Sequence, residues 1–225
     1  MEAEEALRAK FKEIGKVYGY ENVEAEFAPF KEFKVKWQRS YKWADFKVSD
    51  YLSDAPPEVI HGLCDSLFAK IEGEDKEYSE EMCRWITSPE FSENKQPVFL
   101  RRARNITRTT KGESKDLDEA YDRLVELGLV EKDPRIHLTW TIEPNIRMVG
   151  SVSVLMKVIK ISSVLDTENI PDFVLDYVLY HELCHMMIGF DPTATSHGEH
   201  FAKLESKYPK MDEAKEWLKR LCLYL

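Results

Sequence analysis

The chain has 225 residues, of which 43% are hydrophobic and 32% charged, a composition typical of globular proteins and not of disordered ones. Its formal net charge of −9 argues against a uniformly basic nucleic-acid-binding body, although a local basic patch is compatible with it. The acidic residues 1–5 do not resemble a secretory signal, and no apolar run approaches the length of a membrane span. The four cysteines form no C-x-x-C pair, so we expect reduced thiols in a cytoplasmic protein.

The N-terminal half contains helix and strand patterns in succession. Apolar residues at helical spacing predict an amphipathic helix over 2–19. Alternating aromatic and β-branched residues predict a hairpin with strands at 33–37 and 43–51. A helix should follow over 54–73, with Asp54 as its cap, prolines in its first turn and Gly73 at its end. We expect a shorter helix at 78–87.

A dense basic stretch follows, made of Arg101, Arg102, Arg104, Arg108 and Lys111. In an acidic protein such a run is usually a solvated helix face that continues into a loop, and we favour that interpretation. A contact surface for an anionic partner is the alternative.

The C-terminal half continues with an amphipathic helix over 116–127 and a strand over 136–142. A strand system over 147–162 should turn near 155–157. The run 172–188, which follows Pro171, is apolar nearly all round and therefore predicts a buried helix that ends at Gly189. No internal repeat is visible. We divide the chain near residue 112 into regions 1–112 and 113–225.

The buried helix carries the sequence His181-Glu182-Leu183-Cys184-His185, which has the form H-E-x-x-H. Residues four apart lie on the same helix face, so His181 and His185 can bind one zinc ion together. Glu182 can then take a proton from a metal-bound water. A catalytic zinc site generally has three protein ligands and one open position, so a third ligand is expected elsewhere.

The third ligand should come from the segment after Pro192. Ser196 and Glu199 have the spacing of a capping box, which predicts a helix beginning at His197. His197, Phe201, Leu204 and Tyr208 form one stripe of this helix, which would direct His197 inward.

We therefore prefer His197 as the third ligand. His200, which lies about 60° from the stripe, is the runner-up, and Glu199 and Glu205 are weaker candidates. The longer pattern H-E-x-x-H-x-x-G-x-x-H is excluded because Ile188 and Asp191 occupy its glycine and third histidine positions.

Residues 131–208 resemble the SprT-like zinc metallopeptidases, the group that includes Spartan-type proteases. The matching features are the run from Val178 to His185, the pair His197-Gly198 and Phe201 four residues after that histidine. The strand segment from Gly150 to Ser162 also resembles that family, as does the segment from Asp166 to Pro171 that leads into the motif helix.

This resemblance implies an α+β fold with a zincin-like core, in which an antiparallel sheet packs on the H-E-x-x-H helix. It also implies His181, His185 and His197 as zinc ligands and Glu182 as general base. In that family a strand beside the active-site helix receives the substrate as an added strand, and the counterpart here is Arg147 to Ile161.

The sequence thus predicts a zinc-dependent metallopeptidase that acts on a protein or peptide substrate. The helical and β-hairpin region 1–112 would regulate the core or select its substrate. One alternative is a non-catalytic, zinc-stabilised module that binds peptide or nucleic acid, although the net charge gives nucleic acid no support. Another is a latent enzyme, in which the N-terminal region or a side chain blocks the open zinc position.

Overall fold

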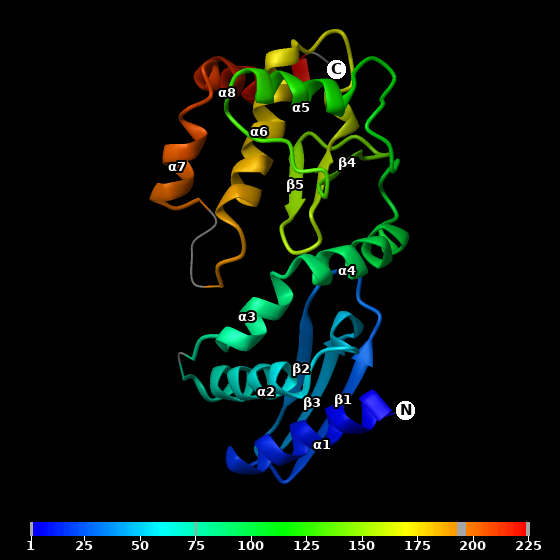
Figure 1. The fold of residues 1–225 in the computed structure, drawn as a ribbon, viewed down its shortest axis with the longest axis vertical. Coiled ribbons are helices and arrows are strands. Elements are labelled where there is room, and N and C mark those ends of the chain that lie inside the picture. Colours follow the sequence, from blue (N-terminus) through cyan, green and yellow to red (C-terminus); the bar gives the residue numbers. More distant parts are fainter. Residues whose placement is uncertain (1, 75, 193–196, 224–225) are drawn as a thin grey trace. The chain divides into compact units, whose positions relative to one another are not determined.

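The computed structural model describes residues 2–74, 76–192 and 197–223. Its contacts group the chain into two compact units, Met1–Lys95 and Gln96–Leu225, here called the N-terminal unit and the C-terminal unit (Figure 1). Within the described residues, helices and two small mixed sheets give an α+β fold. None of the helices described is both long and apolar enough to cross a bilayer. The division predicted near residue 112 falls inside the C-terminal unit.

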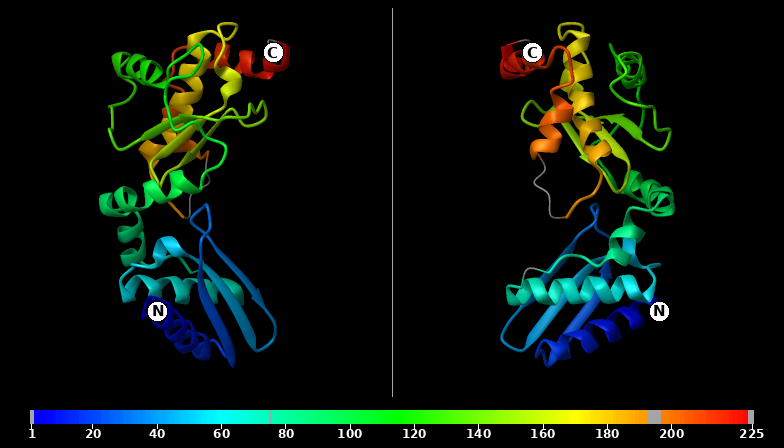
Figure 2. Two further views of the ribbon diagram at one scale, coloured as in Figure 1. Left: turned by 90° about the vertical axis from the view of Figure 1, so that its right-hand side faces the viewer. Right: turned by 60° about the vertical axis from the view of Figure 1, so that its left-hand side comes forward.

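The N-terminal unit contains a three-stranded sheet made of β1 (Asn22–Ala28), β2 (Val35–Arg39) and β3 (Trp43–Ser49). The strand order is β1-β3-β2, with β1 parallel and β2 antiparallel to the central β3. Helices α1 (Glu2–Val17) and α2 (Pro57–Glu72) cover the same face of this sheet (Figure 2). The predicted helices and hairpin are therefore confirmed, whereas β1 is an additional strand.

Aromatic side chains join the two helices to the sheet. The rings of Phe11, Phe46 and Phe68 are fully buried. The Phe46 ring centroid lies 4.8 Å from that of Phe11 and 5.1 Å from that of Phe68. Such ring pairs stabilise a core beyond their buried area. This cluster is the centre of the N-terminal unit.

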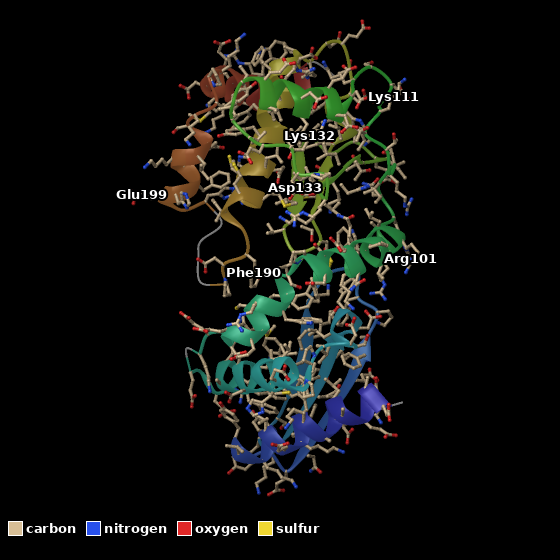
Figure 3. All side chains as sticks on the ribbon, in the orientation of Figure 1. Arg101, Lys111, Lys132, Asp133, Phe190 and Glu199 are labelled. Carbon is tan, nitrogen blue, oxygen red and sulfur yellow. The ribbon has the colours of Figure 1, made fainter. Side chains whose placement is uncertain are left out.

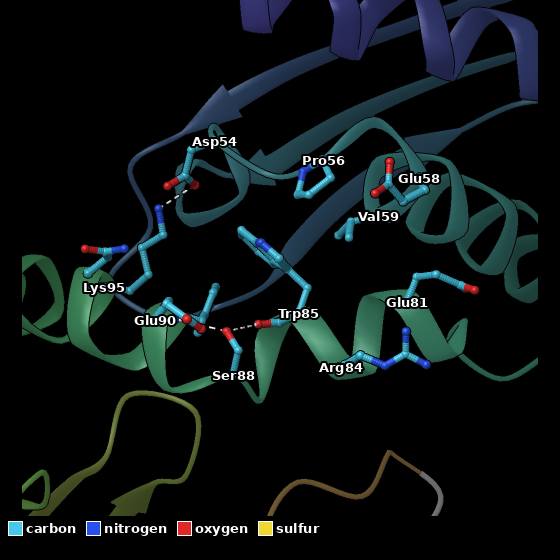
Figure 4. Close-up of a pocket in the computed structure, with 12 residues that line it drawn as sticks. Asp54, Pro56, Glu58, Val59, Glu81, Arg84, Trp85, Ser88, Glu90 and Lys95 are labelled. Carbon is cyan, nitrogen blue, oxygen red and sulfur yellow. Dashed lines mark hydrogen bonds and ion pairs between the residues drawn. The ribbon is translucent and has the colours of Figure 1, made fainter.

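The start of α2 differs from the prediction. Its N-cap is Pro56, without a side-chain cap, and Asp54 instead accepts a 2.5 Å hydrogen bond from Lys95 Nζ. Lys95 belongs to α4 (Pro89–Arg102), which follows α3 (Glu80–Ile86). Together these elements line a hollow of about 510 Å³, into which the Trp85 side chain projects (Figure 4). The prolines alone are enough to start α2, because their fixed φ suits a first helical turn.

The predicted basic stretch ends α4 and continues as a loop. Arg101 and Lys111 are exposed (Figure 3). Arg108 donates hydrogen bonds to the backbone oxygens of Leu100 and Ala103, and so fastens the loop to the end of the helix. This arrangement agrees with a solvated helix face followed by a loop.

The C-terminal unit contains α5 (Leu117–Glu126) and a sheet made of β4 (His137–Trp140), β5 (Gly150–Ser153) and β6 (Val158–Ile161). The strand order is β4-β6-β5, with β4 parallel and β5 antiparallel to β6. The expected antiparallel sheet is therefore mixed. The reason is that the connection after β4 carries the chain past β6, so that β5 forms the opposite edge.

The predicted buried helix is α6 (Asp172–Ile188), and its bounds agree with the prediction. It ends at Gly189, whose φ of 82° favours glycine. Most of its side chains lie in one hydrophobic core with side chains of α5 and the sheet. Two helices follow, α7 (Glu199–Glu205) and the unpredicted α8 (Met211–Lys219). Helix α6 is therefore the central element of this unit.

The two units share one topology, although the sequence shows no repeat. Each runs helix, strand, hairpin and helix, and in each the second hairpin strand is central and parallel to the first strand. Both central strands lead into a short 3-10 turn, η1 (Asp50–Leu52) or η2 (Ser163–Leu165), before a helix preceded by proline.

Candidate metal centre

Three histidines meet beside helix α6. His181 and His185 lie one turn apart on α6, and His197 lies two residues before α7. Each histidine contributes one ring nitrogen, and these three nitrogens all lie within 4.8 Å of one another. The Nε2 atoms of His181 and His197 are 3.3 Å apart. The structure therefore brings together all three predicted ligands.

The Phe201 ring packs against all three imidazoles. Its centroid lies 4.9 Å from that of His181, 4.5 Å from that of His185 and 4.7 Å from that of His197. Phe201 is itself buried. A rigid aromatic ring behind the histidines limits their rotation, so Phe201 helps to hold the group together.

The position of His197 relative to α7 differs from the prediction. Helix α7 begins at Glu199 with Gly198 as its N-cap, so His197 lies in the turn before the helix and not in its first turn. Ser196, the first residue of the predicted capping box, lies outside the described residues. Tyr208 also lies beyond the end of α7, so the predicted stripe is not one helix face, and the His197 side chain is exposed and not directed into the core. His197 still reaches the cluster from this turn, since its Nε2 lies 3.3 Å from that of His181.

The weaker ligand candidates lie elsewhere. Glu199 is exposed on the first turn of α7 (Figure 3). His200, on the same turn, is also exposed, and neither residue belongs to the histidine group. Glu205 also lies outside that group. It contacts the opposite nitrogen of a ligand candidate, since its Oε1 is 2.7 Å from His181 Nδ1.

The surroundings of His181 and His185 favour neutral imidazole. Burial lowers the pKa of His181, and the Glu205 carboxylate opposes this only in part. Burial and the neighbouring histidines lower the pKa of His185 to about 4. A histidine must be neutral to bind a metal, because the ligating nitrogen needs a free lone pair. His181 and His185 are thus in the protonation state that binds a metal near neutral pH.

The donor set fits a zinc ion. Zinc binds imidazole at about 2.0–2.1 Å in tetrahedral geometry, which places two ligand nitrogens about 3.3–3.4 Å apart. The separation of 3.3 Å between the Nε2 atoms of His181 and His197 agrees with this edge. Three imidazoles also leave a fourth position open for a water molecule or a substrate.

Glu182 is almost fully buried, at 6% exposure, next to the first histidine. Burial raises the pKa of its carboxyl to about 7, and the Lys160 charge opposes this shift. Gly150, the first residue of β5, makes room for this side chain. A Cβ at that position would overlap Glu182 Oε1 and lie 3.0 Å from Cδ. A residue larger than glycine at position 150 would therefore clash with the Glu182 side chain.

A cleft of about 710 Å³ opens beside His181 and Glu182. One wall comes from Arg147, Met148 and Gly150, at the edge strand β5 and just before it. The other wall comes from Lys215, Leu218 and Lys219 of α8. The cleft therefore reaches one histidine of the cluster, His181, and the Glu182 side chain.

The sequence interpretation missed several parts of this site. Helix α8 was not predicted, and neither Tyr177 nor Lys215 was considered. Tyr177 could have been found because it lies one turn before His181 on the same face of the motif helix. Nothing in the local pattern places Lys215 or Gly150 against the site, because both reach it through tertiary packing.

Comparison with protein families identifies part of this unit. Residues 157–221 match the family model described as the YgjP-like metallopeptidase domain. This match confirms the SprT-like resemblance, and it covers less than a third of the chain. It contains β6, the motif helix and all three clustered histidines. Comparison with curated proteins and with solved structures gave no significant match.

Proposed function

We propose that the C-terminal unit is a zinc-dependent peptidase that hydrolyses protein or peptide substrates. The observation that carries this proposal is the group of three histidine nitrogens with a buried carboxylate, Glu182, next to His181. The match to a metallopeptidase domain over the same residues supports it. In this proposal His181, His185 and His197 hold the zinc ion, and Glu182 is the general base.

The chemistry would be divided between the metal and the chain. Bound zinc supplies a water of lowered pKa and polarises the scissile carbonyl. Glu182 accepts the proton of the attacking water and returns it to the leaving amine. Burial of Glu182 raises its pKa to about 7, which suits both halves of this transfer near neutral pH.

The substrate would bind as an extended chain. Strand β5 is at the edge of its sheet and borders the cleft, so its free backbone groups can pair with an added strand. Pairing through main-chain groups gives weak sequence preference. The cytoplasmic location and a regulatory or substrate-selecting role of residues 1–112 remain predictions.

A non-catalytic zinc-stabilised binding module is the alternative. The buried Glu182 argues against it, because a structural zinc ion has no use for a base. A structural site is also generally closed by four protein ligands, whereas the described residues bring together three.

Hydrolysis of an unfolded protein, followed with and without a chelator, tests the proposal. The zinc-loaded chain should cleave, the chelated chain should not, and zinc should restore cleavage. Glu182→Gln should keep the bound zinc and lose about 10²- to 10⁴-fold in rate, because the base is gone. Glu199→Gln, an exposed control on α7, should cleave like the wild type. Undiminished cleavage by zinc-loaded Glu182→Gln would refute the assigned role.

A further inference from the structure

The carboxylate of Glu205 lies beside the cluster and contacts several hydrogen-bonding groups. It lies on the last turn of α7, and its side chain is only 12% exposed. Its Oε1 is 2.7 Å from His181 Nδ1 and accepts from Tyr177 Oη at 2.8 Å. Its Oε2 accepts from Lys215 Nζ at 3.0 Å. Three donors from α6 and α8 therefore converge on one group.

The contacts of Glu205 are those of a hydrogen-bond acceptor, because Tyr177 Oη and Lys215 Nζ both donate to its oxygens. A carboxylate oxygen accepts hydrogen bonds, so the His181 Nδ1 that faces it at 2.7 Å is the nitrogen that carries the proton. The other nitrogen, Nε2, then holds the lone pair and faces His197 Nε2 at 3.3 Å.

The position of Glu205 is itself fixed by the fold. Tyr177 stands one turn before His181 on α6, so both side chains reach the carboxylate from one helix face. Lys215 reaches it from α8, the helix that forms a wall of the cleft. Tyr180 Oη also donates to the backbone oxygen of Leu204, which anchors the end of α7 on α6. Glu205 therefore cannot turn away without breaking contacts to two other helices.

We propose that Glu205 is a positioning residue of the metal site, which fixes the tautomer and ring orientation of His181 from behind. This proposal rests on the proposed zinc-binding function. Carboxylates that orient ligating histidines typically change metal affinity by about 10- to 100-fold when they are removed. Glu205 thus acts on the metal through His181 and contacts neither metal nor substrate.

Zinc affinity of the full-length chain, measured by competition with a chromophoric chelator, tests this role. Glu205→Ala should weaken zinc binding about 10- to 100-fold. Glu205→Gln should fall between Ala and the wild type, because its amide oxygen can still accept from Nδ1. Glu213→Gln, an exposed control on α8, should bind like the wild type. The absorption spectrum of the cobalt-substituted protein should shift in both Glu205 variants and stay unchanged in the control.

Thermal unfolding of the zinc-free proteins separates positioning from general stability. Zinc-free Glu205→Gln should unfold close to the wild type, so that its weaker zinc binding reflects the site. If Glu205→Ala does not fold, Glu205→Gln decides the question. Zinc affinity within about twofold of the wild type, with an unchanged cobalt spectrum, would overturn the role of Glu205 alone. A wild-type chain that binds no zinc would overturn the proposed function as well.

Discussion

The two units of this chain follow the same plan but differ at one helix junction. In the N-terminal unit, α2 meets the segment before α3 through small residues. A Cβ on Gly62 would overlap the Ser79 hydroxyl, and Ser66 donates to the backbone oxygens of Gly62 and Glu77. In the C-terminal unit, α6 meets the segment that leads into α7 through His181, His185 and His197. The corresponding junction is closed by tight packing in one unit and carries the three clustered histidines in the other.

This difference shows that the topology alone does not make the site. Helix α2 contains one histidine, His61, which is exposed. Helix α6 contains two on the same face, and α7 adds the carboxylate of Glu205, whose side chain is 12% exposed. One topology can therefore occur with and without such a cluster, because function depends on the side chains at a site.

The strongest test of this comparison removes a ligand. His197→Ala should weaken zinc binding by more than the roughly 10- to 100-fold expected for loss of a supporting residue, because it removes a direct metal contact. Chelator competition on the full-length chain measures the loss. His61→Ala, on the equivalent helix of the other unit, is the control and should leave zinc affinity unchanged. Equal effects of the two substitutions would break the comparison.

The second test asks whether each unit depends on its own core. Phe46→Ala should destabilise the N-terminal unit by about 3–5 kcal/mol, and Leu179→Ala should destabilise the C-terminal unit by about 2–5 kcal/mol, since both side chains are fully buried. Denaturant unfolding gives these values. Only Leu179→Ala, which loosens the motif helix, should also weaken zinc binding. A matching loss of zinc affinity in Phe46→Ala would show that the units are coupled.

The third test uses two glycines that both face a carboxylate. Gly150→Ala should displace Glu182 and slow hydrolysis by about 10²-fold, because small misplacements of a reacting group are costly. Zinc content should not change. Gly112→Ala would crowd the Asp166 carboxylate instead, away from the histidines. It should lower the melting temperature and leave the hydrolysis rate per folded molecule unchanged. A normal rate in Gly150→Ala would show that Glu182 can adjust.

The sequence predicts those features that depend on local periodicity. The bounds of α6 follow from a run that is apolar nearly all round and lies between Pro171 and Gly189, and the β2–β3 hairpin follows from alternation. His197 was predicted from its spacing to Phe201, although the structure places it before the helix that carries Phe201. In each case the signal lies within one continuous segment of the sequence.

Other features depend on residues far apart in sequence and were missed. Strands β4 and β6 pair in parallel although β5 lies between them in the sequence. The periodicity of apolar residues carries no information about this strand order. Strand β1 alternates Val23 and Ala25 with glutamates, which are weak strand formers. Glu205 is only a weak ligand candidate in the sequence, which shows that a carboxylate follows the motif but not which atom it contacts. The choice between the two nitrogens of His181 requires the packing of α7 on α6.

The smallest expected effect concerns His200, the histidine that the sequence left as an alternative third ligand. It is exposed on the first turn of α7 and lies outside the group formed by the other three histidines. His200→Ala should therefore change zinc affinity by less than about twofold and the free energy of unfolding by less than about 0.5 kcal/mol. Chelator competition and denaturant unfolding measure these quantities. A large loss of zinc affinity in His200→Ala, together with normal zinc binding in His197→Ala, would show that His200 and not His197 is the third ligand. The third ligand would then lie within the first turn of α7, and not in the turn that precedes this helix.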